Sequence, residues 1–65
     1  MAHGSRIAAA RRERGLTRAE LAKLVDVSRQ AVYDWENGKD IKLSNLRKVA
    51  KATKKPLAFF VGAAA

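Results

Sequence analysis

The stretch LTRAELAKLVDVSRQAVYDWENGK, residues 16–39, decides the fold because it contains the beginnings of two helices. Thr17 and Glu20 have the spacing of a capping box, in which the hydroxyl accepts a backbone N–H and the carboxylate reaches back to the cap. The helix that they open extends to about Val25, because Ser28 caps another helix three residues later. Helices joined so closely must cross steeply, and the sequence therefore predicts a helix-turn-helix.

Apolar residues at helical spacing indicate which side chains of these two helices face the core. We expect the second helix to run from Arg29 to about Asn37 and the core to include Leu21, Ala22, Leu24, Val25, Val32 and Trp35. Ala22 is small enough for a close crossing, and Val32 fills the angle from the other side. Asp26 falls in the turn, and aspartate is among the few residues that tolerate a positive φ there.

Caps and stops outside this stretch divide the remaining chain into three more helices. Ser5 is expected to cap a helix that extends to Arg14, before a glycine. Ser44 is expected to cap a fourth helix, and Pro56 to begin a fifth that ends near Val61. No stretch alternates with period two for long enough to indicate a strand. The sequence therefore predicts an all-α, compact bundle of about five short helices.

Sixty-five residues are enough for one small domain. We expect residues 6–62 to form the helix-turn-helix domain, residues 1–5 to be a disordered tail or a cloning scar, and residues 63–65 to be a frayed end. The absence of cysteine excludes disulfides and thiolate metal sites. No apolar run approaches the roughly 20 residues that span a bilayer. We expect no metal and no cofactor.

Charge is the first indication of function. Fourteen lysines and arginines oppose six acidic residues, for a net charge of +8. Residues 5–18 carry five arginines and one glutamate, and residues 41–65 carry six cations and no acid, whereas residues 19–40 are net acidic. This balance indicates a polyanionic partner, nucleic acid before an acidic membrane surface. A basic surface that serves only solubility is the alternative.

The chain resembles the Cro/phage-repressor type of helix-turn-helix family over roughly residues 7–61. The resemblance is carried by Leu16–Ala22, Val27–Val32 and Trp35–Lys39. The end, Leu46–Lys51 and Lys55–Phe60, is similar to members fused to a metallopeptidase-like domain. The resemblance implies a lambda-repressor-like DNA-binding fold, either as a full small repressor or as an excised domain. Asp26 departs from the family, which usually has glycine there.

The resemblance also implies that the helix beginning at Ser28 lies in the major groove with its first residues facing the bases. The expected base-reading residues are Ser28, Arg29, Gln30, Tyr33 and Asp34. Arg29 can donate two hydrogen bonds to guanine, and Gln30 can pair with adenine in the same way. Tyr33 could touch a thymine methyl group or a phosphate. Asp34 could accept from cytosine N4 or hold the guanidinium of Arg29. An ordinary solvated helix face is the alternative for these side chains.

Phosphate contacts are expected from helix N-termini and from cations near the reading helix. The residues concerned are Thr17, Arg18, Asn37, Gly38, Lys39, Lys42 and Ser44. Thr17 and Arg18 open a helix, where free N–H groups and the helix dipole favour an anion. In the family the segment from Asn37 to Lys39 meets the DNA backbone. With about six phosphates neutralised, log affinity should fall against log salt with a slope of about −5.

Two further roles follow from the resemblance and from helical spacing. In similar proteins an arginine of the first helix pairs with the glutamate before Asn-Gly, and Arg11 and Glu36 occupy these positions as a structural pair. Leu57, Phe60 and Val61 can face the core together, which leaves Phe59 as an outward aromatic and a dimer contact. A loosely packed terminal aromatic is the alternative for Phe59.

The expected function is a sequence-specific double-stranded DNA-binding transcriptional regulator, most simply a cytoplasmic, nucleoid-associated prokaryotic or phage repressor. It would bind a palindromic operator as a homodimer, because one reading helix covers only about four or five base pairs. The alternatives are an antitoxin-type or other protein-interaction module, with a toxin or a fused effector domain as partner, and an excised N-terminal domain. An enzyme or a small-molecule substrate is not expected, because the chain has one histidine, in the tail, and no enclosed carboxylate pair.

Overall fold

The computed structural model describes residues 2–61, and within them it has five helices and no strand. The helices are α1 (Ala2–Glu13), α2 (Arg18–Val25), α3 (Arg29–Glu36), α4 (Leu43–Thr53) and α5 (Leu57–Val61). The all-α prediction is confirmed. The predicted frayed end, residues 63–65, lies outside the described residues.

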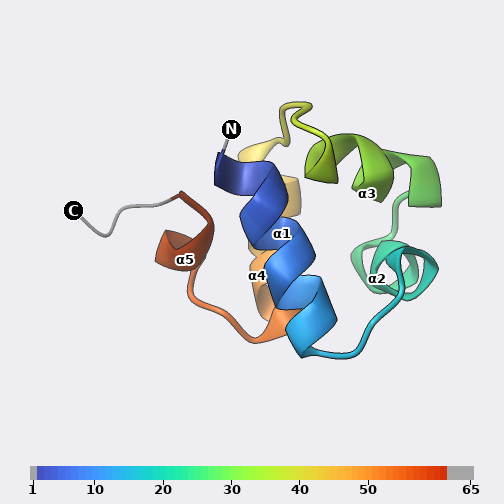
Figure 1. The fold of residues 1–65 in the computed structure, drawn as a ribbon, viewed down its shortest axis with the longest axis horizontal. Helices are drawn as coiled ribbons and strands as arrows, with labels where there is room; N and C mark the ends of the chain where they lie inside the picture. The colour runs from blue at the N-terminus through green and yellow to red at the C-terminus, as the bar shows by residue number, and fades with distance from the viewer. Residues whose placement is uncertain (1, 62–65) are drawn as a thin grey trace.

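Helix α1 forms the centre of the bundle (Figure 1). It packs against α3, α4 and α5, while α2 packs against α3 and α4. In the view of Figure 1, α5 lies on one side of α1 and the α2–α3 pair lies on the other. The helix-turn-helix therefore projects from one side of the bundle.

The local signals that predicted the helix-turn-helix are present in the structure. The N–H of Thr17 donates to Oε1 of Glu20 at 2.8 Å, and the N–H of Glu20 donates to Oγ1 of Thr17 at 3.1 Å, which completes the capping box. Asp26 ends α2 in the left-handed region with φ 65° and ψ 48°. Ser28 caps α3 by accepting the N–H of Ala31 at 3.0 Å.

Two predicted caps were wrong. Helix α1 begins at Ala2, so Ser5 lies inside the helix and does not cap it. The earlier start places Gly4 in a buried position against the backbone at the end of α3. Helix α4 begins at Leu43, one residue before Ser44, and no side chain caps its first turn. The origin of residues 1–5 stays a prediction.

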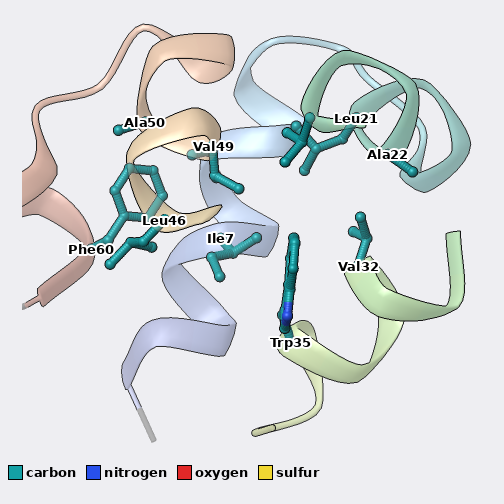
Figure 2. Packing of buried hydrophobic residues seen from close by; sticks show 11 residues of the cluster. Ile7, Leu21, Ala22, Val32, Trp35, Leu46, Val49, Ala50 and Phe60 are labelled. Carbon is teal, nitrogen blue, oxygen red and sulfur yellow. The ribbon is translucent and has the colours of Figure 1, made fainter. Parts of the chain in front are cut away.

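The core lies where the five helices meet, with Phe60 contributed by α5 (Figure 2). Trp35 and Val32 point inward from α3, and Ala22 is 3% exposed at the crossing, as expected. Leu24 was expected in the core but is 61% exposed. It follows Leu21 and Ala22 on an eight-residue helix, and it is turned by about 100° from Val25, the last buried residue of α2.

The orientation of α5 also differs from the expectation. Val61 is 43% exposed, whereas Phe60 is fully buried. Phe59 is half-buried and packs against the core instead of facing outward. The adjacent rings of Phe59 and Phe60 meet edge to face with centroids 5.2 Å apart. Helix α5 is thus oriented so that Phe59 and Phe60 pack on the core and Val61 faces solvent.

Candidate nucleic-acid interface

A shallow hollow lies where the beginnings of α2 and α3 meet. Its lining consists of Arg11, Thr17, Arg18, Ala19, Arg29, Gln30 and Tyr33. Three of these residues carry a guanidinium group, and none is acidic. Thr17 and Arg18 lie at the N-terminus of α2, where free N–H groups favour an anion. The hollow therefore brings part of the expected phosphate set together with part of the expected base-reading set.

The expected base-reading side chains stand on the outer face of α3. Ser28, Arg29, Gln30 and Tyr33 are exposed, and Tyr33 is 46% exposed. Val32 and Trp35 hold the opposite face in the core. A helix seated in this way offers one row of polar side chains to a groove.

Asp34 is half-buried, and its hydrogen-bond partner is Gln30, whereas Arg29 was the candidate from the sequence. Nε2 of Gln30 donates to Oδ1 of Asp34 at 2.9 Å, so this carboxylate holds the amide of Gln30 and not the guanidinium of Arg29. Residues four apart on a helix are neighbours, and this spacing could have indicated the contact in the sequence. The bond fixes one hydrogen of the Gln30 amide.

Glu36, at the end of α3, accepts hydrogen bonds from two arginines. Its Oε2 accepts from Nε of Arg11 at 2.7 Å, and its Oε1 accepts from Nε of Arg18 at 2.8 Å. The Glu36 side chain is 3% exposed and that of Arg11 is 9% exposed. The pair of Arg11 and Glu36 that the resemblance implies is thus present in the structure.

The environment of Glu36 keeps its carboxyl group ionised. Burial by itself raises the pKa of Glu36, but the hydrogen bonds from Arg11 and Arg18 and their positive charges outweigh it. The pKa consequently lies below its usual value of 4.5. The Glu36 side chain is therefore ionised at neutral pH.

Arg18 forms a link that the sequence did not indicate. Besides its bond to Glu36, its guanidinium lies over the ring of Tyr33, with Cζ 5.3 Å from the centroid. Arg18 was expected only as a phosphate contact. Arg18 and Glu36 are 18 residues apart and belong to different helices, so no local spacing connects them.

The remaining expected phosphate residues lie outside the hollow, in the segment from the end of α3 to the start of α4. Asn37, Gly38, Lys39, Lys42 and Ser44 are all exposed. Nδ2 of Asn37 donates to the carbonyl of Tyr33 at 2.8 Å, which closes the end of α3. Gly38 has φ 102°, a conformation that favours glycine.

Phe59 lies among cations, apart from the hollow. Nη1 of Arg6 donates to the Phe59 carbonyl at 2.9 Å, and its guanidinium carbon lies 5.6 Å from the ring centroid. Nζ of Lys55 lies 5.1 Å from the same centroid. This arrangement connects Arg6 of α1 to α5.

A sequence family described as helix-turn-helix matches residues 7–60. No curated protein matches the chain. Among the described residues, no helix has both the length and the apolar character that crossing a membrane requires.

Proposed function

The chain belongs to the helix-turn-helix family of the Cro/phage-repressor type, a family of DNA-binding domains, and from that premise we propose that it is a sequence-specific transcriptional repressor. The observation that carries the proposal is the exposed outer face of α3, which meets the N-terminus of α2 in a hollow lined by three arginines and no acid. A polar helix face flanked by cations suits the major groove of double-stranded DNA.

The first turn of α3 supports direct reading of bases. Arg29 and Gln30 are exposed and adjacent, and they precede Tyr33 on the same face by one helical turn. We assign Arg29 to a guanine and Gln30 to an adenine, since each can form two hydrogen bonds with the edge of that base. Ser28 and Tyr33 complete the proposed reading set. Each half-site would then contain neighbouring G and A.

Phosphates on either side of the groove would be held by two groups of residues. Thr17 and Arg18 offer the N-terminus of α2 and a cation on one side. The exposed residues Asn37, Gly38, Lys39, Lys42 and Ser44 form the other group. The proposed slope of log affinity against log salt, about −5, assumes about six neutralised phosphates. The cations of these two groups, Arg18, Lys39 and Lys42, account for part of that number.

A palindromic operator bound by a homodimer completes the proposal. A single reading helix covers too few base pairs for useful specificity in a genome. We propose Phe59 as a dimer contact because it is only half-buried, and because its helix, α5, lies on the opposite side of α1 from the helix-turn-helix (Figure 1). Sedimentation of Phe59→Ala and of the control Val61→Ala tests this. An unchanged monomer–dimer equilibrium in Phe59→Ala would contradict the proposal that Phe59 is a dimer contact.

The experiment that tests the function is selection from a random pool of double-stranded DNA at near-physiological salt. Enrichment of inverted half-sites one helical turn apart supports a dimeric operator binder. Enrichment of a single short half-site supports an excised domain whose dimerisation lies elsewhere. Binding without any enriched sequence contradicts sequence-specific regulation and leaves only a basic surface.

The assignment of Arg29 is tested on the selected duplex. Arg29→Ala should relax the preference at one base position by about 1–3 kcal/mol. Arg12→Ala is the matched control, because Arg12 is exposed on α1 and does not line the hollow. An equal loss of affinity on every sequence would mean that Arg29 contacts a phosphate and not a base.

A module that binds a protein partner is the weaker candidate. The exposed large apolar side chains of the described residues, Leu24, Tyr33, Leu43 and Val61, come one from each of four helices. Single exposed apolar residues are ordinary on a soluble surface. Nothing in this distribution favours a protein groove over DNA.

A further inference from the structure

We propose that Glu36 is a positioning residue for DNA binding, which acts through Arg18 by holding its guanidinium against Tyr33 before DNA arrives. The inference rests on the proposed function and adds the means by which α2 and α3 present one surface. Glu36 itself does not touch the DNA in this proposal. Its effect is on the cation beside the reading helix.

The geometry divides the guanidinium of Arg18 into an anchored end and a free end. Nε donates to Oε1 of Glu36 at 2.8 Å, and the carboxylate side chain is only 3% exposed. The Arg18 side chain is 39% exposed and lines the hollow. Among the hydrogen bonds of the described residues, Arg18 uses Nε alone. Its two terminal nitrogens are therefore left to meet a ligand in the hollow.

The ring of Tyr33 lies beside the anchored group. It lies 5.3 Å from Cζ of Arg18 and belongs to the exposed face of α3. A guanidinium favours such a position because the face of an aromatic ring is electron-rich. The cation from α2 is thus placed beside the side chains that α3 offers to the bases.

The cluster of Arg11, Arg18 and Glu36 carries a net positive charge. Arg11 is buried with Glu36 and already forms two hydrogen bonds with its carboxylate. Two cations therefore share one anion, and the exposed member is Arg18. A phosphate in the hollow would complete the balance, with a charge-assisted hydrogen bond to the free end.

Pre-positioning matters because an arginine has many rotamers. A side chain that is already ordered loses less entropy on binding, so affinity rises without any added charge. Lysine at the same position keeps the charge, but it has no Nε to hold and no plane to stack. Charge and positioning can therefore be separated at residue 18.

The first measurement needs no DNA. Nuclear magnetic resonance of arginine Nε–H groups in the free protein should show Arg18 protected from exchange with water, as Arg11 is. Arg12 is the internal reference, because its side chain is exposed and takes part in none of the side-chain hydrogen bonds or ion pairs of the described residues. Exchange at Arg18 as fast as at Arg12 would overturn the proposal, because the guanidinium would then be free before DNA arrives.

The second measurement compares Arg18→Lys with Arg12→Lys on the duplex that selection enriches. We expect Arg18→Lys to bind about tenfold more weakly, with an unchanged salt slope, because the charge stays and the fixed geometry is lost. Arg12→Lys should bind as the original chain does. Equal binding by Arg18→Lys would overturn the positioning role, since charge alone would then suffice.

The variant Glu36→Gln provides an independent test. Its results are interpreted only if circular dichroism shows that the variant is folded. It should raise Arg18 Nε–H exchange toward that of Arg12 and weaken DNA binding. If the substitution alters neither the exchange nor the binding, the proposal is overturned. Should Glu36→Gln fail to fold, the two Arg18 measurements decide. Failure of the original chain to bind any duplex is a separate result, which ends the proposed function whatever Arg18 does.

Discussion

Arg11 on α1 is tied to Glu36 at the end of α3 by hydrogen bonds of 2.7 Å from Nε and 3.3 Å from Nη2. The same guanidinium donates from Nη1 to the carbonyl of Leu16 at 2.9 Å. One side chain thus connects the first helix, the segment that leads into α2 and the end of α3. The relative placement of α2 and α3 depends on this connection as well as on the apolar core.

Replacing Arg11 by methionine should destabilise the fold by about 3 kcal/mol. The substitution leaves the Glu36 carboxylate buried with only the half-exposed Arg18 beside it. Urea unfolding followed by circular dichroism measures the change. Arg12→Met is the control and should alter the free energy of unfolding by less than about 0.5 kcal/mol, since Arg12 is exposed. Similar effects of the two substitutions would show that the buried pair adds nothing to stability.

The depressed pKa of Glu36 makes part of the stability depend on pH. The folded chain binds a proton at Glu36 less readily than the unfolded chain, whose pKa is near the usual 4.5. The stabilisation is therefore complete above that value and is lost as pH falls through the lower folded pKa. Unfolding free energies of the original chain and Glu36→Gln should converge as pH falls below 4.5. Two curves that stay parallel throughout would exclude this linkage.

Gly4 marks a close approach between α1 and α3. A Cβ atom at this position would lie 2.7 Å from the carbonyl oxygen of Trp35 and 2.8 Å from that of Glu36. Gly4→Ala should therefore destabilise the fold by about 1–3 kcal/mol, although alanine favours helix. Ser5→Ala, an exposed change in the same turn, should alter stability by less than about 0.5 kcal/mol. A Gly4→Ala chain that melts at a higher temperature would mean that α1 does not rest on α3 there.

The elements that the sequence predicted well are those fixed by contacts between neighbours in the chain. The capping box of Thr17 and Glu20 and the cap at Ser28 each join residues three apart. Asp26 follows a helix that ends within one residue of the predicted position, and its left-handed backbone was expected. Such signals determine where α2 and α3 begin and end, and these bounds determine their crossing.

The parts that the sequence did not predict depend on packing between distant segments. The early start of α1 is accompanied by a buried contact of Gly4 with the end of α3, and nothing near Ser5 indicates it. The bond from Arg18 to Glu36 likewise joins residues 18 positions apart. In the site, the resemblance implied the Arg11–Glu36 pair, and five of the residues that line the hollow were expected DNA contacts. The contacts of Arg18 with Glu36 and Tyr33 required three-dimensional positions.

Asp26 offers a test of backbone strain in the turn. Its φ of 65° is unfavourable for residues other than glycine. Asp26→Gly should stabilise the fold by about 0.5–1 kcal/mol, after allowing for the greater freedom of glycine in the unfolded chain. Asp40→Gly removes the same charge at an exposed residue without a positive φ, and it should not stabilise. Thermal unfolding of the two variants measures the difference, and equal gains would assign the effect to charge.

The bond from Gln30 to Asp34 gives the last prediction, which concerns specificity. With Nε2 held at 2.9 Å by the Asp34 carboxylate, the amide of Gln30 has one orientation, leaving Oε1 and one N–H for a base. Asp34→Ala frees the amide to turn, so the preference at the base that Gln30 reads should weaken by about 1 kcal/mol.

Overall affinity should move in the opposite direction from specificity in Asp34→Ala. Removing a carboxylate from α3, the helix proposed to enter the groove, reduces repulsion of phosphates, so binding to unrelated duplexes at low salt should strengthen. Asp40→Ala removes the same charge away from α3 and should leave base preference unchanged. Binding to duplexes that carry each of the four bases at the position read by Gln30 measures both effects. Should Asp34→Ala keep the full preference, the orientation of Gln30 would have to come from the DNA itself and not from its neighbour on α3.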